Sequence, residues 1–298
     1  MKDFIWKIIF FAACVFVPLV CVEVYVENLP NPSRDKHKWM LQNSHEVKTL
    51  VLGSSHTFYG IRPDLLPLPA FSLAQIAQTY RYDWYLLSHY TMDSLQTVIL
   101  PFSYFSLYED FENMPRERYN AIRYRLYMDC DLHSPLSYYG FEWSSIDALM
   151  EKLKSLWQPQ ALSWDSLGWG TDYSLVKRSP NWDNGMEAAK NNTYADTSLV
   201  ALNVALLDSM MTYCDRRNVR LLLITTPLSS GFMENMSVQQ VERNKRYLNL
   251  LLGRHPNVEY TDYSKDSDFV DMDFYDSHHL SEYGAKKLTL KLADKLSP

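Results

Sequence analysis

Two short segments near opposite ends of the chain carry residue types suited to nucleophilic catalysis. The first is Gly53-Ser54-Ser55-His56, which ends an apolar, β-branched run at 47–53. A glycine at the end of a strand lets the backbone turn sharply. A serine one or two residues after it can then project its hydroxyl from the sheet edge, with backbone N–H groups nearby to bind an oxyanion. The segment predicts a serine nucleophile, at Ser54 or Ser55.

The second segment is Asp276-Ser277-His278-His279-Leu280, which precedes a predicted helix at 282–295. A spacing of three residues lets the Asp276 carboxylate reach Nδ1 of His279 and fix its tautomer. Nε2 of the same ring is then free to take a proton from a serine. We therefore predict that one of these serines, His279 and Asp276 form a catalytic triad as nucleophile, base and orienting carboxylate.

Each segment taken alone also fits a simpler interpretation, a small-residue turn for the first and a surface turn with a helix cap for the second. A Gly-x-Ser pattern should occur roughly once by chance in a chain of this length. The two segments together, one ending the first strand and one opening the last helix, are a stronger indication than either alone.

The intervening sequence alternates between predicted strands and helices, which is typical of a parallel sheet covered on both faces. The predicted strands are 47–53, 69–73, 96–102, 219–225 and 257–260, and the predicted helices are 76–91, 195–217, 238–252 and 282–295. In such sheets the chemistry occurs where loops leave the carboxyl ends of the strands, so the two segments should converge there. Residues 103–194, rich in Tyr, Trp, Ser and Pro, predict an insertion with a helix at 143–156.

The N-terminal residues predict a membrane anchor at 1–27. Residues 8–22 form an uncharged apolar run between Lys7 and Glu23, and with its apolar flanks the run approaches the length of a bilayer span. A cleaved signal peptide is the alternative, but no small-x-small cleavage site follows the run. The polar, proline-containing residues 28–46 predict a linker, and 47–298 the soluble domain. Basic residues flank the span on both sides, so charge does not set its orientation.

The sequence resembles the SGNH (GDSL-type) hydrolase superfamily. Gly53-Ser54-Ser55 matches its nucleophile block with serine in place of the usual aspartate, and 276–280 with Gly284 matches its C-terminal block. The resemblance implies a three-layer α/β/α sandwich of flavodoxin-like type and ester hydrolysis or acyl transfer. It also implies Ser55 as the nucleophile, His279 as the general base and Asp276 as the group that orients it. It also implies an oxyanion donor within 71–78, where Ala77 stands in for the family's glycine, and another after 96–102, where Ser103 replaces an asparagine.

Among members of that superfamily, the anchored chain is similar to the D-alanyl transfer proteins of teichoic acid modification and the alginate O-acetylation proteins. This implies a single-pass protein of the bacterial cytoplasmic membrane with its catalytic domain on the extracytoplasmic, periplasmic side. It also implies a polysaccharide or other glycopolymer substrate, acylated through Ser55, and a membrane-bound O-acyltransferase as partner. The rival hypothesis is a non-catalytic, anchored scaffold that binds polysaccharide or that acyltransferase.

The remaining features define what we do not expect. A net charge of −6 and no local Lys/Arg cluster argue against a nucleic-acid partner. We expect no cofactor and no metal, because adjacent histidines such as His278 and His279 usually point apart. His56 is predicted either to line the substrate pocket or to bond to the backbone. The 21 Tyr and 8 Trp residues either pack the core or stack on sugars.

Overall fold

The computed structural model describes residues 1–67, 69–111, 114, 120–130, 141, 142, 146, 149, 150, 152, 153 and 163–296. The predicted insertion at 103–194 is therefore only partly covered, and the predicted helix at 143–156 lies largely outside the described residues.

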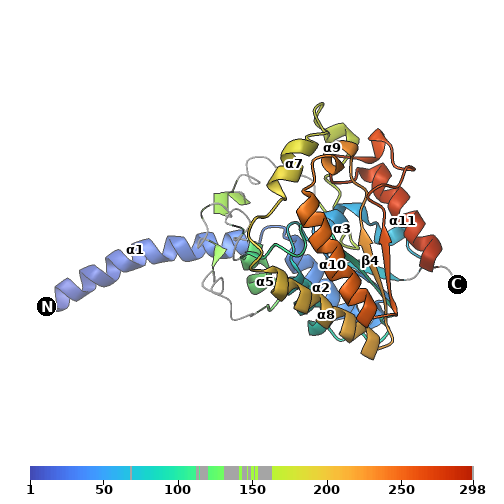
Figure 1. Ribbon diagram of the computed structural model, residues 1–298. Coiled ribbons are helices and arrows are strands. Elements are labelled where there is room, and N and C mark those ends of the chain that lie inside the picture. The colour runs from blue at the N-terminus through green and yellow to red at the C-terminus, as the bar shows by residue number, and fades with distance from the viewer. Residues whose placement is uncertain are drawn as a thin grey trace.

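The described part of the chain forms one five-stranded parallel sheet (Figure 1). The strands are β1 (Thr49–Val51), β2 (Ala70–Ser72), β3 (Thr97–Pro101), β4 (Arg220–Thr225) and β5 (Val258–Asp262). Their order is β2-β1-β3-β4-β5, the flavodoxin-like arrangement. Each strand falls on a predicted strand, although β5 runs two residues further. The prediction of a parallel α/β fold is confirmed.

The helices lie on both sides of this sheet. They are α2 (Pro32–Asn43), α3 (Ser55–Gly60), α4 (Tyr80–His89), α5 (Asn120–Tyr127), α7 (Gly185–Asn191), α8 (Val200–Arg216), α9 (Ser230–Met233), α10 (Val238–Arg254) and α11 (Glu282–Leu296). Within the described residues, short 3₁₀ turns accompany them: η1 (Ser44–Glu46), η2 (Pro63–Leu65), η6 (Leu175–Lys177) and η7 (Asp271–Asp273).

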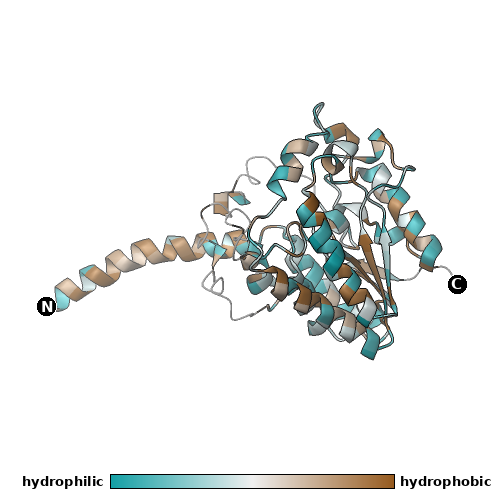
Figure 2. Cartoon of the chain, in the orientation of Figure 1, coloured by the Kyte–Doolittle hydropathy of each residue, from teal (hydrophilic) through white to brown (hydrophobic). Residues whose placement is uncertain are grey.

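Alternating residues of the strands feed two separate cores, because successive side chains of a strand point to opposite faces. Leu50, Val98 and Leu221 pack in the larger core, with apolar residues of α2, α4, α8 and α10. Their neighbours along each strand, such as Val51 and Ile99, pack in the smaller core against α11. Figure 2 shows β4 as a brown, apolar strand within the body of the molecule. The architecture is a three-layer α/β/α sandwich.

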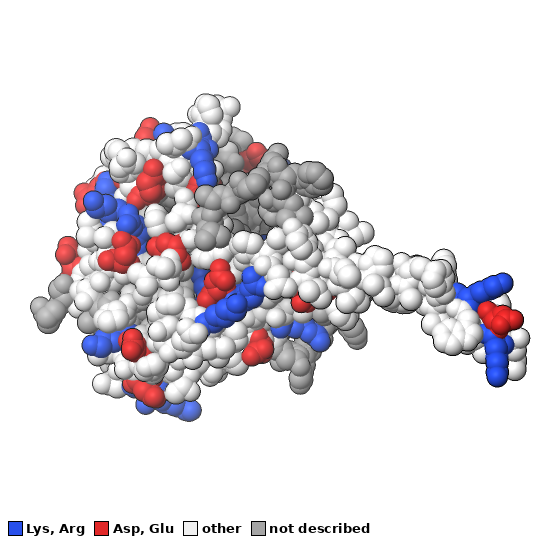
Figure 3. Space-filling model, turned by 180° about the vertical axis from the view of Figure 1, so that it is seen from behind, with Lys and Arg blue, Asp and Glu red and all other residues white. Residues whose placement is uncertain are grey.

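The N-terminal helix α1 (Lys2–Glu27) projects from this body as a long rod (Figure 1). Its 26 residues span about 39 Å at 1.5 Å per residue, more than the roughly 30 Å of a bilayer's hydrocarbon core. None of its most apolar 18-residue window is buried within the protein. Figure 3 shows it white between a charged tip and the body. It is long and apolar enough to cross a membrane.

The prediction that 28–46 is a linker is wrong. Most of it forms α2 and η1, because Asn31 and Pro32 are a helix start rather than loop residues. The Asn31 side chain accepts hydrogen bonds from the N–H groups of Ser33 and Arg34, and Pro32 occupies the first turn, where its missing N–H costs nothing. Arg34 in turn donates to the carbonyls of Glu27 and Leu29 at 2.5 and 2.9 Å. The end of α1 is thus held directly against α2.

Candidate active site

The turn after β1 exists only because residue 53 is glycine. Gly53 has φ +108°, and a Cβ there would lie 2.2 Å from Cγ of Pro101 on the neighbouring strand β3. The turn places Ser54 before α3 and Ser55 at its first position, where the side chain is partly exposed. The order of the strands reverses between β1 and β3, which is where ligands bind in open parallel sheets.

The C-terminal segment forms a tight turn around one carboxylate. Oδ1 of Asp276 accepts hydrogen bonds from the backbone N–H groups of His278 and His279, at 3.0 and 2.9 Å. The turn is held against the body by Gly284 of α11, because a Cβ there would lie 2.0 Å from the carbonyl oxygen of Asp273. Gly53 and Gly284 therefore both allow close packing around the site.

These two turns bring the three predicted triad residues together. Oγ of Ser55 lies 2.8 Å from Nε2 of His279, and Nδ1 of the same ring lies 2.9 Å from Oδ2 of Asp276. Burial alone would raise the pKa of Asp276, but the attraction of His279 and hydrogen bonds from both histidine rings hold it well below its usual value. The carboxylate is therefore ionised, and the geometry is that of a nucleophile, a base and an orienting group.

Among the described residues, two backbone N–H groups at or beside the turn that holds Ser55 donate no hydrogen bond. Ala77 has φ +59°, the left-handed region that glycine adopts most readily, which agrees with its standing where the resemblance places a glycine. Its loop lies beside the nucleophile turn, since the N–H of Gln75 donates to the carbonyl of Gly53 at 3.1 Å. Within the described ranges, the N–H groups of Ala77 and Ser55 have no acceptor.

Ser103 does not share this availability. Its hydroxyl lies 2.9 Å from Nδ1 of His56, and its N–H donates to Oγ of Ser106 at 2.9 Å. The prediction that Ser103 binds an oxyanion therefore gains no support from its hydrogen bonds. The residue supports the neighbouring histidine instead.

His56 packs beneath the triad as a buried, neutral imidazole. Its Nδ1 contacts the hydroxyls of Ser103 and Thr226, at 2.9 and 3.2 Å, so its bonds go to side chains and the predicted backbone bond is wrong. Burial lowers its pKa well below the usual value, and His279 and His278 add to the shift. In the part of the chain that the structure describes, Nε2 of His56 has no partner.

His278 also belongs to the site, which the sequence analysis did not anticipate. Its ring centroid lies 4.0 Å from that of His279, because both rings approach the same Asp276 oxygen, at 3.2 Å for Nδ1 of His278 and 3.0 Å for Nδ1 of His279. The premise that adjacent histidines point apart is therefore wrong here. One ring nitrogen each from His56, His278 and His279 lies within 4.8 Å of the others.

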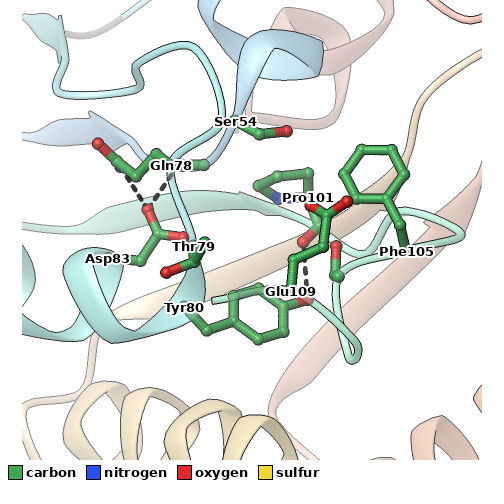
Figure 4. A pocket seen from close by; sticks show the side chains of 10 residues that line it. Ser54, Gln78, Thr79, Tyr80, Asp83, Pro101, Phe105 and Glu109 are labelled. Atoms are coloured by element: carbon green, nitrogen blue, oxygen red, sulfur yellow. Dashed lines mark hydrogen bonds between the residues drawn. The ribbon is translucent and has the colours of Figure 1, made fainter. Parts of the chain in front are cut away.

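A buried polar network connects the nucleophile turn to the Ala77 loop. Oδ1 of Asp83, on α4, accepts hydrogen bonds from the N–H of Gly53 at 2.7 Å and from Nε2 of Gln78 at 2.6 Å. Figure 4 shows the Asp83 and Gln78 side chains meeting beside a small cavity that Ser54 also lines. Burial raises the pKa of Asp83 to about 7, although both hydrogen bonds oppose the shift. No sequence motif marks this residue.

Stacked tyrosines flank His279. The ring of Tyr173 lies 3.6 Å from that of Tyr59 and 4.1 Å from that of Tyr275, in parallel stacks, and meets His279 edge-on at 5.1 Å. Tyr59 is buried, whereas Tyr173 and Tyr275 are partly exposed. Part of the aromatic-rich segment therefore does reach the site.

Comparison with known proteins gives similarity to solved structures only. No family model matches the chain, and no curated protein matches it. Among solved structures, the chain is similar to a protein from Streptococcus pneumonia provisionally described as a platelet activating factor, with 10% identity, a TM-score of 0.47, and 97% of this chain and 99% of that chain covered.

Two further structures are similar at a TM-score of 0.42. One is a provisionally assigned acylhydrolase from Bacteroides fragilis, at 11% identity over 87% of this chain and 95% of that chain. The other is a GDSL-like lipase from Bacteroides thetaiotaomicron, at 10% identity over 90% of this chain and 100% of that chain.

Proposed function

We propose that the chain is an SGNH-type serine esterase or O-acyltransferase. The observation that carries the proposal is the contact of Ser55 Oγ with His279 Nε2 at 2.8 Å, backed by the Asp276 carboxylate at 2.9 Å on the other ring nitrogen. A serine next to a base that is itself oriented by a third group is the arrangement that activates a hydroxyl for attack.

In this mechanism Oγ of Ser55 attacks the carbonyl carbon of an ester while Nε2 of His279 takes the hydroxyl proton. The carbonyl π electrons move to the oxygen, and the oxyanion binds the free N–H groups of Ser55 and Ala77. The tetrahedral intermediate then collapses, and the leaving alcohol takes the proton from His279. Water or a second alcohol resolves the acyl-Ser55 by the same steps in reverse order.

The proposed acceptor is a sugar hydroxyl of an extracytoplasmic glycopolymer. Tyrosine rings suit the flat apolar faces of pyranoses, and the partly exposed Tyr173 and Tyr275 stand beside the base. Helix α1, held against α2 by Arg34, would fix the domain at the outer face of a bacterial cytoplasmic membrane. A membrane-bound O-acyltransferase is the proposed source of acyl groups.

One observation favours the rival hypothesis of a binding scaffold. The side chain at the position of the expected asparagine, Ser103, is directed to His56, which leaves an oxyanion hole made of backbone N–H groups alone. A single oxyanion donor contributes roughly 3 to 4 kcal/mol to the barrier, so this feature would slow a catalyst.

Hydrolysis of a chromogenic acetyl ester by the full chain in detergent micelles tests the proposal. We expect turnover that Ser55→Ala abolishes. The matched control is Ser54→Ala, because the neighbouring Ser54 hydroxyl is buried and makes no hydrogen bond among the described residues. A set of soluble oligosaccharides added to the assay separates the two activities, since transfer yields an acylated sugar. Absence of turnover by the folded wild type would favour the scaffold.

A further inference from the structure

Three histidines at the nucleophile are arranged as metal ligands usually are. In a metal site, each ligating imidazole typically has its second ring nitrogen held by a hydrogen-bond partner, which fixes the ring and leaves the first nitrogen for the ion. Nδ1 is the held nitrogen in His56 and His279, and Nδ1 of His278 is held more loosely, by a 3.2 Å contact with Asp276. The partners are the hydroxyls of Ser103 and Thr226 for His56, and the Asp276 carboxylate for the other two.

The opposite nitrogens are the ones left for a ligand. Nε2 of His56 is enclosed, and no partner for it exists among the residues that the structure describes. The buried, unpaired nitrogen is costly in a folded protein unless something binds it. Among the described residues, the hydrogen-bond partner of His279 Nε2 is the Ser55 hydroxyl, which can rotate away.

We propose that His56, His278 and His279 bind a divalent transition ion of the Zn²⁺ class. Imidazole nitrogen suits Zn²⁺, Cu²⁺ and Ni²⁺, whereas Mg²⁺ and Ca²⁺ require oxygen ligands. One nitrogen from each ring already lies within 4.8 Å of the others. Zn–N bonds of about 2.0–2.1 Å in a tetrahedron place the nitrogens about 3.4 Å apart, so the rings must turn to bring their Nε2 atoms to that spacing.

The site allows this movement. Nδ1 of His278 makes only long contacts, at 3.2 Å to Asp276 and 3.4 Å to Ser277, and its side chain is 17% exposed. Its ring can therefore turn toward His56 without breaking a short hydrogen bond. Water or the Ser55 oxygen, already 2.8 Å from Nε2 of His279, would complete the four ligands.

Binding has a direct consequence for the chemistry. The metal ion would occupy the lone pair of His279 Nε2 that takes the proton of Ser55, so the ion and the acylation reaction exclude each other. This consequence rests on the proposed function, whereas metal binding itself does not. A bound metal ion would then inhibit the reaction of Ser55 reversibly.

The first experiment measures Zn²⁺ affinity of the full chain in micelles by competition with a chromogenic chelator, with Mg²⁺ alone as a comparison. We expect one Zn²⁺ per chain and no Mg²⁺ binding. His278→Ala should weaken Zn²⁺ binding at least tenfold. His278→Phe should do the same while keeping a ring against Phe232, its stacked neighbour at 5.4 Å. The matched control, His45→Ala, removes an exposed histidine outside the site and should leave the affinity unchanged.

The second experiment measures the rate at which a fluorophosphonate labels Ser55, with and without Zn²⁺. Saturating Zn²⁺ should slow labelling of the wild type at least tenfold, and EDTA should restore it. In His278→Ala, the ratio of the two rates should return toward one at the same Zn²⁺ concentration.

The outcomes separate the two claims. Equal Zn²⁺ affinity in the wild type and in both folded His278 variants would overturn the metal site, whatever the labelling shows. Tight Zn²⁺ binding that leaves the labelling rate unchanged would overturn the proposed inhibition of Ser55 by the metal ion. A metal-free wild type that does not label would refute the proposed function, and the affinities would still decide the metal site.

Discussion

Neutralising the buried carboxyl of Asp83 should make the protein more stable, by an amount that grows with pH. The variant is Asp83→Asn, whose amide oxygen can still accept the hydrogen bonds from Gly53 N–H and Gln78 Nε2. The folded protein raises the pKa of this carboxyl from 3.8 to about 7, because burial disfavours the charged form. The substitution removes the charge and keeps the shape.

The sign follows from proton binding. Because the folded state holds the proton more tightly than the unfolded state, the wild type loses stability as the pH rises from the unfolded pKa through the folded one. The full shift of about 3 pKa units corresponds to roughly 4 kcal/mol above pH 7. Part of this loss has already occurred at pH 5, so the stability difference between Asp83→Asn and the wild type should grow by roughly 2–3 kcal/mol between pH 5 and pH 8.

The assay is urea unfolding of the full chain in micelles, followed by tryptophan fluorescence at pH 5, 6, 7 and 8. The control variant is Asp93→Asn, which makes the same substitution at an exposed carboxylate on the surface after α4. If the difference between Asp83→Asn and the wild type were constant over this range, the carboxyl would not be held protonated by burial, and the reasoning would be refuted.

Three further substitutions follow from the packing and charges of the site. Gly53→Ala should lower the free energy of unfolding by roughly 2–6 kcal/mol, because the new Cβ clashes with Pro101 and the backbone is left-handed. The control is Gly253→Ala, which has open space around it and should raise the free energy of unfolding by up to about 1 kcal/mol. Urea unfolding measures both. Asp276→Asn should lower the fluorophosphonate labelling rate by on the order of 10³–10⁴-fold without unfolding the protein, and a loss below tenfold would contradict its orienting role. Lys36→Met should leave stability unchanged or raise it at pH 7, because burial lowers the pKa of the Lys36 ammonium well below its usual value. The same pKa shift makes the wild type more stable as pH rises. Any stability advantage of Lys36→Met over the wild type should therefore shrink between pH 7 and pH 9. If Lys36→Met were less stable than the wild type by more than about 1 kcal/mol at pH 7, the hydrogen bond of Lys36 to the Ala74 carbonyl would outweigh the cost of burial.

Most of the strands, and the meeting of Asp276 with His279, were predictable because their signals are local. β1, β3 and β4 lie in apolar runs, and Asp276 and His279 lie close enough in sequence to meet in a single turn. The bond of Ser55 to His279 joins residues 224 positions apart, yet a parallel sheet places all carboxyl strand ends at one edge. The approach of Ser55 to His279 was therefore predictable from the topology of the sheet, not from sequence spacing.

Residues 28–46 were mispredicted because composition was weighed above capping. The segment is polar, but its Asn-Pro pair starts a helix, and Lys36 is buried there with its ammonium bonded to the carbonyl of Ala74 at 2.5 Å. Burial of a lysine runs against the usual distribution of residues, so no pattern rule anticipates it.

The supporting residues of the site belong to no motif in the sequence. Asp83 reaches the nucleophile turn from α4, and Tyr173 reaches His279 from a segment more than 100 residues earlier in the chain. Such contacts depend on how the layers pack rather than on spacing. His278 was visible, but only the shared Asp276 oxygen shows why its ring turns toward His279.

Reaction of the full chain in micelles with a fluorophosphonate, read by intact mass, tests the central claim most directly. The account predicts one adduct per wild-type chain and none in Ser55→Ala or His279→Ala, since the hydroxyl is reactive only when Nε2 of His279, at 2.8 Å, accepts its proton. A folded wild type that gains no adduct, or a Ser55→Ala variant that keeps it, would contradict the assignment of Ser55 as an activated nucleophile.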